Sequence, residues 1–192
     1  MTTAHTYLTA LSPIEYRADD PQGNLAAVRE ALRRHEQRRS PFKQCPMVHM
    51  VRLQVIDKVR PPIGAQRAAP LQSSYLLLAA ELDGSVDDFL DCLHRVDSGF
   101  VRNVWGRCIG YPRYDGAVFL RRYIARCTLR GELPYAAFGL SVGRTLEALA
   151  LKERLSDFVA AAQGLDAARL QQEWQRQRQG LVRTGAIPPG SS

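Results

Sequence analysis

Two segments in the first half of the chain alternate between apolar and polar positions. In residues 47–57, one side carries His49, Val51, Leu53 and Val55. The other side is more polar and carries Met50, Arg52, Gln54 and Ile56. In residues 74–83, an apolar side lies opposite a mixed side made of Tyr75, Leu77, Ala79, Glu81 and Asp83. Such alternation is typical of half-buried strands, so we predict two neighbouring strands here.

Two more strands and two helices are predicted around this pair. Residues 5–14 are rich in Thr, Tyr and Leu, which favour a pleated setting. Residues 117–128 form a fourth strand-like run, although both of its faces are mixed. Apolar side chains recur at helical spacing in residues 25–38 and, after the capping residue Ser85, in residues 86–96.

The remaining segments of the first two thirds are predicted to be irregular. Residues 58–72 contain three prolines and form a loop long enough to be functional. Residues 98–115 are interrupted by Gly and Pro, with a short helical turn through Trp105.

The C-terminal part is predicted to be helical, over residues 142–163 and 167–179. Ser141 is the expected N-cap of the first helix, and Gly164 ends it. Residues 139–143 match the Gly-x-Ser-x-Gly motif of hydrolases, but all histidines precede Ser141, contrary to the hydrolase order. The cap therefore explains Ser141 better than catalysis does.

The order of the first six elements is β-α-β-β-α-β, which is the ferredoxin-like arrangement. It predicts an α+β fold with a four-stranded antiparallel sheet and two helices on one face. We expect residues 1–130 to form this domain, followed by a C-terminal helical extension (131–185) packed on the same core and a flexible tail (186–192). The other face of the sheet is left for the C-terminal helices or a second subunit to cover.

The strings Leu-Thr-Ala-Leu-Ser-Pro-Ile, Val-His-Met-Val-Arg-Leu-Gln-Val-Ile-Asp and Glu-Leu-Asp-Gly resemble the dimeric α/β-barrel superfamily of ferredoxin-like proteins. The resemblance is remote and covers residues 5–128. It implies a homodimer in which two sheets close on each other, often around a pocket. Members include haem-dependent peroxidases, monooxygenases, isomerases and stress proteins, so the resemblance implies an architecture rather than a reaction.

Composition and charge change this picture little. The chain is 45% hydrophobic and 23% charged, which is ordinary for a globular domain. Its net charge of +7 comes mostly from dispersed arginines, and the strands lack an RNA-recognition signature, so nucleic acid is disfavoured as a partner. We expect no membrane span and, without a signal-peptide pattern, a cytoplasmic location.

The cysteines and histidines predict neither a disulfide framework nor a metal site. The four cysteines are scattered without a Cys-x-x-Cys pair, which is typical of free, mostly buried thiols. Cys45 with His49, and Cys92 with His94, fall short of the four close ligands of a structural zinc site. The cofactor is unknown; His49 lies on the apolar side and becomes a haem- or metal-ligand candidate only if the alternation shifts by one residue.

The more polar side of the predicted sheet is the first candidate site. Arg52 and Glu81 share this side, and Asp83 lies at its rim. Because buried charges need partners, Arg52 and Glu81 are either a structural ion pair or a site. In the second case Arg52 holds an anionic substrate and Glu81 moves a proton. The catalytic candidates are Arg52, Glu81 and Asp83.

The irregular segment 98–115 supplies the second candidate, because aromatic residues in loops often line pockets. Together with Tyr75, the substrate-binding candidates are Trp105, Tyr111, Arg122 and Tyr123. Cys108 beside Arg107 is a candidate reactive thiol, since a nearby cation lowers a thiol pKa. A core plug under a loop explains the aromatic residues equally well.

These features predict a protein that binds a small, partly apolar, anionic molecule in a pocket on the open sheet face. The chemistry expected there, if the protein is an enzyme, is oxidative or acid–base conversion. Two alternatives remain at this point: a non-catalytic interaction or accessory protein, and a binder of single-stranded nucleic acid.

Overall fold

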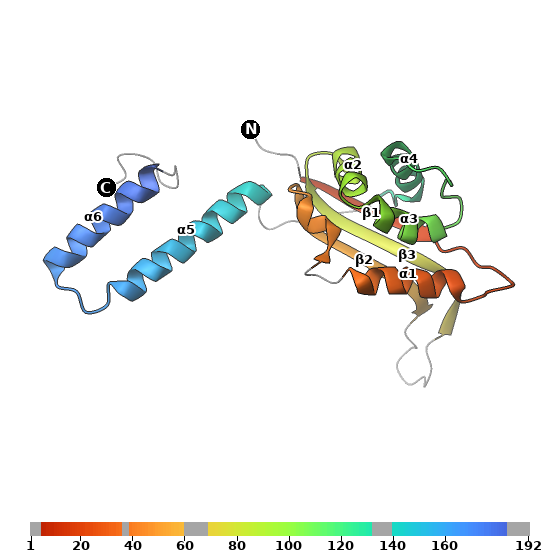
Figure 1. The fold of residues 1–192 in the computed structure, drawn as a ribbon, viewed down its shortest axis with the longest axis horizontal. Helices are drawn as coiled ribbons and strands as arrows, with labels where there is room; N and C mark the ends of the chain where they lie inside the picture. The colour runs from red at the N-terminus through yellow and green to blue at the C-terminus, as the bar shows by residue number, and fades with distance from the viewer. Residues whose placement is uncertain (1–4, 36–38, 60–68, 132–139, 184–192) are drawn as a thin grey trace. The chain divides into compact units, whose positions relative to one another are not determined.

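The structure is a computed structural model that describes residues 5–35, 39–59, 69–131 and 140–183. The chain divides into two compact units, residues 1–139 and residues 140–192. The described part of the first unit contains an antiparallel sheet and several helices, and that of the second contains two helices (Figure 1). The predicted α+β class is therefore confirmed.

Three strands form one antiparallel sheet among the described residues. They are β1 (His5–Pro13), β2 (Val48–Val59) and β3 (Ala69–Asp83), in the spatial order β1-β3-β2. The predictions of three strands, at 5–14, 47–57 and 74–83, are confirmed. β3 begins earlier than predicted because Ala69 and Pro70 pair with the end of β2. Of the predicted loop 58–72, residues 60–68 lie outside the described residues.

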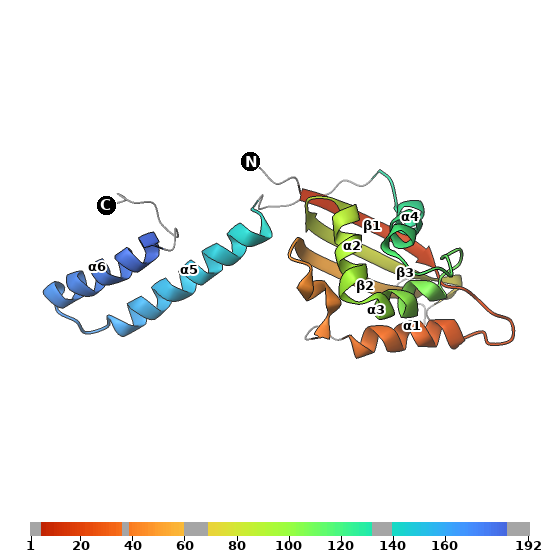
Figure 2. The same ribbon diagram turned by 45° about the horizontal axis from the view of Figure 1, so that its top comes forward.

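Helices cover one face of this sheet. α2 (Val86–Val96), α3 (Ser98–Val104) and α4 (Ala117–Cys127) lie over it, and α1 (Gly23–Arg34) packs beside α3 (Figures 1 and 2). The short 3-10 helices η2 (Pro41–Gln44) and η3 (Trp105–Arg107) belong to the same layer. Fully buried side chains between the layers include Leu76, Leu78, Leu82, Phe89, Leu93, Phe100 and Trp105.

The helix predictions in this unit are confirmed with small changes at the ends. The second predicted helix has the predicted bounds, and Ser85 Oγ accepts a hydrogen bond from Asp88 N at 3.0 Å as its N-cap. α1 begins at Gly23 rather than after Asn24, whose side chain instead donates to Glu15 O at 3.1 Å. The end predicted for this helix, residues 36–38, lies outside the described residues.

The predicted strand at 117–128 is wrong, because Ala117–Cys127 form helix α4. Its buried residues are Leu120, Tyr123 and Ile124, which have the i, i+3, i+4 spacing of one helical face. The strand propensity of the aromatic and branched residues is overridden by the burial of this stripe. Residues 98–115 are also less irregular than predicted, since α3 precedes the turn through Trp105.

The outer edge of β1 is occupied by single contacts rather than by a fourth strand. Leu129 N donates to Thr9 O at 2.8 Å, and Ile109 N donates to Pro13 O at 2.8 Å. Ala10 and Thr128 form an isolated antiparallel bridge at the same edge. With three described strands, the four-stranded β-α-β-β-α-β arrangement is not confirmed.

The second unit contains helices α5 (Val142–Ala161) and α6 (Ala167–Arg183), as predicted. Ser141 Oγ accepts from Arg144 N at 3.3 Å, which confirms its role as N-cap. The rings of Phe158 and Trp174 lie 5.5 Å apart and join the two helices. No helix in the described ranges has the length and apolar character that crossing a membrane requires. The predicted tail, 186–192, lies outside the described residues.

Leu77 and Leu78 are a matched pair for testing the buried face, because they are adjacent on β3 and point to opposite sides. Leu78 is 1% exposed. We expect Leu78→Ala to lower the free energy of unfolding by about 2–5 kcal/mol, since it leaves a cavity in the core. Leu77→Ala should cost about 1 kcal/mol or less. Urea denaturation of both variants measures the difference, and a loss of about 1 kcal/mol or less for Leu78→Ala would contradict its burial under the helices.

Candidate functional site

The face of the sheet opposite the helices is the candidate site. The even-numbered residues of β3 from Leu76 to Leu82 are buried under the helices, and its odd-numbered residues from Tyr75 to Asp83 are half-buried on the other side. This other side is here called the open face. The strand register brings the odd-numbered residues of β1 onto the same face.

Along the open face, ionisable side chains give way to apolar ones. At one end His5 pairs with Asp83, and Tyr7 pairs with Glu81. In the middle, Thr9 and Arg52 flank Ala79 from the two sides. The other end carries Leu11, Pro13, Gln54, Ile56, Tyr75 and Leu77. The face therefore has a charged end and a largely apolar end.

A β-bulge in β2 places His49 on the open face. Val48 pairs with Leu82 and Met50 pairs with Glu81, so His49 is an extra residue opposite β3. The strict alternation on which the sequence prediction relied breaks at this point. The expectation that His49 lies on the apolar side is therefore wrong: its Nε2 atom lies 2.9 Å from Asp83 Oδ1.

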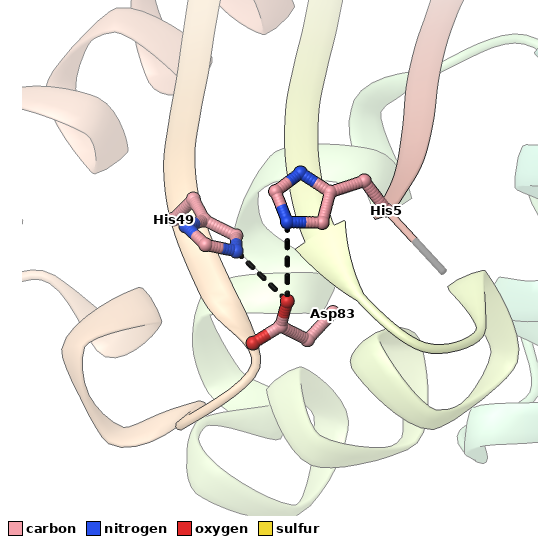
Figure 3. Close-up of side chains that lie close together, drawn as sticks. All are labelled: His5, His49 and Asp83. Atoms are coloured by element: carbon pink, nitrogen blue, oxygen red, sulfur yellow. Dashed lines mark hydrogen bonds and ion pairs between the residues drawn. The ribbon is translucent and has the colours of Figure 1, made fainter. Parts of the chain in front are cut away.

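Two imidazole rings converge on the carboxylate of Asp83 (Figure 3). His49 Nε2 lies 2.9 Å and His5 Nε2 lies 3.8 Å from the same oxygen, Asp83 Oδ1. The other nitrogen of His5, Nδ1, lies 3.3 Å from Glu81 Oε1. The side chains of His5 and His49 are 12% and 15% exposed. The cluster is thus shielded by protein and still reachable from solvent.

The ends of the strands fix this cluster in place. Asp83 N donates to Met47 O at 2.8 Å, directly before the bulge. Gly84 follows with a φ of +87°, a left-handed conformation that suits glycine and ends β3 after the carboxylate. Thr6 Oγ1 donates to the carbonyl of Gly84, which holds the start of β1 against the end of β3.

Tyr7 extends the polar end of the open face. Partial burial is the largest cause that raises the pKa of Tyr7 above its usual value. The negative charge of Glu81 and a hydrogen bond with its carboxylate raise this pKa further. The phenol therefore stays protonated at neutral pH and can donate a hydrogen bond to Glu81. Tyr7 thus contacts Glu81, and His5 joins Glu81 to the cluster around Asp83.

The structure brings together some of the predicted catalytic residues. Glu81 and Asp83 lie beside His49, which the sequence named only as a ligand candidate, and beside His5, which it did not name. Arg52 is exposed in the middle of the open face and makes no ion pair within the described part of the chain. The structural ion pair considered for Arg52 and Glu81 is therefore not formed. Tyr75 lies on the same face, at its apolar end.

The aromatic candidates lie on the other side of the sheet. Trp105 is fully buried and packs against Phe100, with ring centroids 6.1 Å apart. Tyr123 is buried, and its hydroxyl donates to Ile109 O at 3.2 Å. Tyr111 packs edge-on against Tyr123, with ring centroids 5.1 Å apart. Arg122 is exposed on α4. These four residues are not brought together with Arg52 and Glu81, and the aromatic ones form part of the core layer.

Burial makes Cys108 a poor nucleophile. Desolvation by burial raises the pKa of Cys108 to about 12. A hydrogen bond with Tyr123 lowers this pKa, and the nearby thiol of Cys127 raises it. Arg107 donates to Asn24 Oδ1 at 3.4 Å. The expectation of a reactive thiol at this position is therefore wrong. The four cysteines are free thiols, as predicted.

The sequence prediction missed His5 and Tyr7, and it named His49 only as a ligand candidate that depended on a shift of the alternation. The bulge that redirects His49 could not be predicted, because the residues around it keep a regular alternation of apolar and polar side chains. His5 and Tyr7 could have been found from the register, because they pair with Asp83 and Glu81 across β1 and β3. That register depends on contacts between residues far apart in the sequence, which one strand alone does not specify.

Comparison with known proteins assigns no family. No family model, no curated protein and no solved structure matches the chain at a significant level. The resemblance to the dimeric α/β-barrel superfamily thus stays a prediction, and the function is argued from the chain's own residues.

The thiol pKa values predict which cysteines react in the folded protein. With a pKa of about 12, Cys108 is almost entirely protonated at pH 8, and burial likewise raises the pKa of Cys45 to about 12. We expect iodoacetamide to modify the half-buried Cys127 first and to leave Cys45 and Cys108 unmodified until denaturant is added. Peptide mass spectrometry measures the order, and equally fast labelling of Cys108 and Cys127 would contradict the burial.

Proposed function

We propose that the open face binds a small, partly apolar, anionic molecule and transfers a proton to or from it. The observation that carries this proposal is the convergence of two imidazoles and two carboxylates at one end of a face whose other end is apolar. Binding sites of small molecules combine an apolar lining with a few placed polar groups.

Arg52 is the cation that would hold the anionic group. It lies between the ionisable end and the apolar end, opposite Ala79 of β3, where a small side chain leaves room. A guanidinium binds a carboxylate or phosphate through two parallel hydrogen bonds. Leu77 and Tyr75, further along the face, would contact the apolar part of the molecule.

Glu81 and Asp83 are the groups that would exchange protons. Each lies within 4 Å of an imidazole nitrogen, as the distances of 3.3 Å for His5–Glu81 and 2.9 Å for His49–Asp83 indicate. Carboxylate and imidazole groups are the common general acids and bases of enzymes. The catalytic assignment of the proposal is thus Glu81 and Asp83, assisted by His5 and His49, with Arg52 binding the substrate.

The same proposal includes a ferredoxin-like relationship, a homodimer and a cytoplasmic location. The antiparallel order β1-β3-β2 supports the relationship. An open face with half-buried apolar residues supports coverage by a second subunit. The four free cysteines agree with a reducing compartment.

A protein-interaction function is the second candidate, and the second unit favours it. α5 has no buried residue, and Leu146, Leu149 and Val159 are between 55% and 60% exposed. An open apolar groove of about 590 Å³ lies along this helix and includes Leu151, Leu155 and Val159. A helix usually gains its stability by burying an apolar face, so a partner protein would complete this one.

The test of the first proposal uses 1-anilinonaphthalene-8-sulfonate, a fluorescent probe that is anionic and partly apolar. We expect Arg52→Ala to weaken its binding about tenfold, which corresponds to roughly 1.4 kcal/mol, because the cation that holds the sulfonate is lost. Fluorescence titration measures the dissociation constants in the presence of a chelator. Arg126→Ala is the matched control, since Arg126 is exposed on α4 on the other side of the sheet. Equal affinity of both variants would argue against the open face as the binding site.

The test of the second candidate is native mass spectrometry of freshly purified full-length protein, which reports subunit count and retained partners together. We expect Val159→Asp to remove a complex formed through α5, because it places a charge in the apolar groove. Glu153→Gln, an exposed change on the same helix, should leave the complex intact. A complex that survives Val159→Asp would form through another surface and would contradict this function for the second unit.

A further inference from the structure

We propose that His5, His49 and Asp83 bind a divalent first-row transition-metal ion such as zinc. The inference rests on the proposed function and refines it: with an ion bound, His5, His49 and Asp83 serve as its ligands, and Glu81 is the carboxylate left to exchange protons. Each of the three strands supplies one side chain: His5 from β1, His49 from β2 and Asp83 from β3 (Figure 3). The bulge at His49 is what completes the set.

The distances suit a metal ion. The ligand atoms of the three side chains all lie within 4.8 Å of one another. In a tetrahedral site with bonds of about 2.0–2.2 Å, neighbouring ligand atoms are about 3.4 Å apart. The two nitrogen–oxygen distances to Asp83, 2.9 Å and 3.8 Å, lie on either side of that value. Small side-chain rotations would bring the three atoms into coordination without moving the strands.

The charge of the cluster favours a cation. Asp83 and Glu81 place two carboxylates beside the two imidazoles, on side chains that are 15% and 23% exposed. Carboxylates attract a divalent cation, and neutral imidazoles are the form that ligates a metal.

Glu81 occupies the position of an outer-shell carboxylate. Its Oε1 atom lies 3.3 Å from Nδ1 of His5, near enough to form a hydrogen bond after a small side-chain rotation, while Nε2 of the same ring faces Asp83. Histidines that bind metals usually present their second nitrogen to such a carboxylate, which fixes the tautomer and the ring orientation. Glu81 is therefore a positioning residue for the metal, and Tyr7 holds it in turn.

The ligand set indicates the class of ion and of site. Imidazole nitrogen suits zinc, iron, nickel or copper, whereas magnesium and calcium prefer an all-oxygen environment. Three protein ligands leave one coordination position open, which is typical of catalytic sites rather than structural ones. The open position is available to the anionic molecule that Arg52 would hold.

The experiment measures metal binding directly on tag-free, full-length protein. We expect isothermal titration with Zn²⁺ to give one site per chain, and His49→Ala and Asp83→Asn to lose it. Glu81→Gln should weaken binding about 10- to 100-fold, as loss of an outer-shell partner does. His94→Ala is the control that should bind normally, because His94 lies on α2 and pairs with Asp115 at 2.8 Å.

Co²⁺ provides a second readout that identifies the ligands. Nitrogen and oxygen ligation gives visible d–d bands without the near-ultraviolet charge-transfer band of a thiolate, so binding at Cys45 and Cys92 would be recognised and would overturn the proposal. His49→Gln keeps the size of the side chain and guards against a folding defect in His49→Ala. No zinc binding, or equal binding by wild type, His49→Gln and Asp83→Asn, would also overturn it. The titration with 1-anilinonaphthalene-8-sulfonate, which tests the open face as a binding site, is carried out with chelator and therefore does not depend on a metal. The absence of a metal site and the absence of a binding site on the open face thus give different results.

Discussion

The pairing of β3 on both of its sides is the constraint on which the first unit depends. Because β3 is the central strand, its alternation decides which residues of β1 and β2 meet the helices and which meet the open face. The buried leucines at even positions fix this choice. A shift of register by one residue would expose them and bury Glu81 and Asp83, so the hydrophobic core also determines where the ionisable residues lie.

The bulge at His49 is a local exception that the rest of the sheet tolerates. One extra residue in β2 redirects a single imidazole, and the pairing of Val51 with Ala80 restores the core alternation immediately afterwards. The candidate site therefore depends both on the register of the whole sheet and on one local irregularity in β2. The register brings His5 to Asp83 across the sheet, and the bulge adds His49 from the opposite strand.

Local patterns in the sequence predict much of the fold but only part of the site. The alternation of residues 47–57 and 74–83 predicts β2 and β3, and Ser85 and Ser141 mark the helix starts correctly. The strand predicted at 117–128 fails because Leu120, Tyr123 and Ile124 bury a helical stripe that strand propensity hides. Glu81 and Asp83 follow from alternation alone, whereas the position of His49 requires the bulge and the burial of Trp105 requires its packing against Phe100 of α3.

The hydrogen bonds at the outer edge of β1 have a consequence for the behaviour of the protein at high concentration. An exposed strand edge is a template for pairing with other chains and a common start of aggregation. Thr9 and Pro13 already use their outward carbonyls for Leu129 and Ile109. Irregular backbone thus protects the edge of β1 as a regular fourth strand would. The other edge strand, β2, bears the charged side chains of Arg52 and Lys58, which disfavour edge-to-edge association.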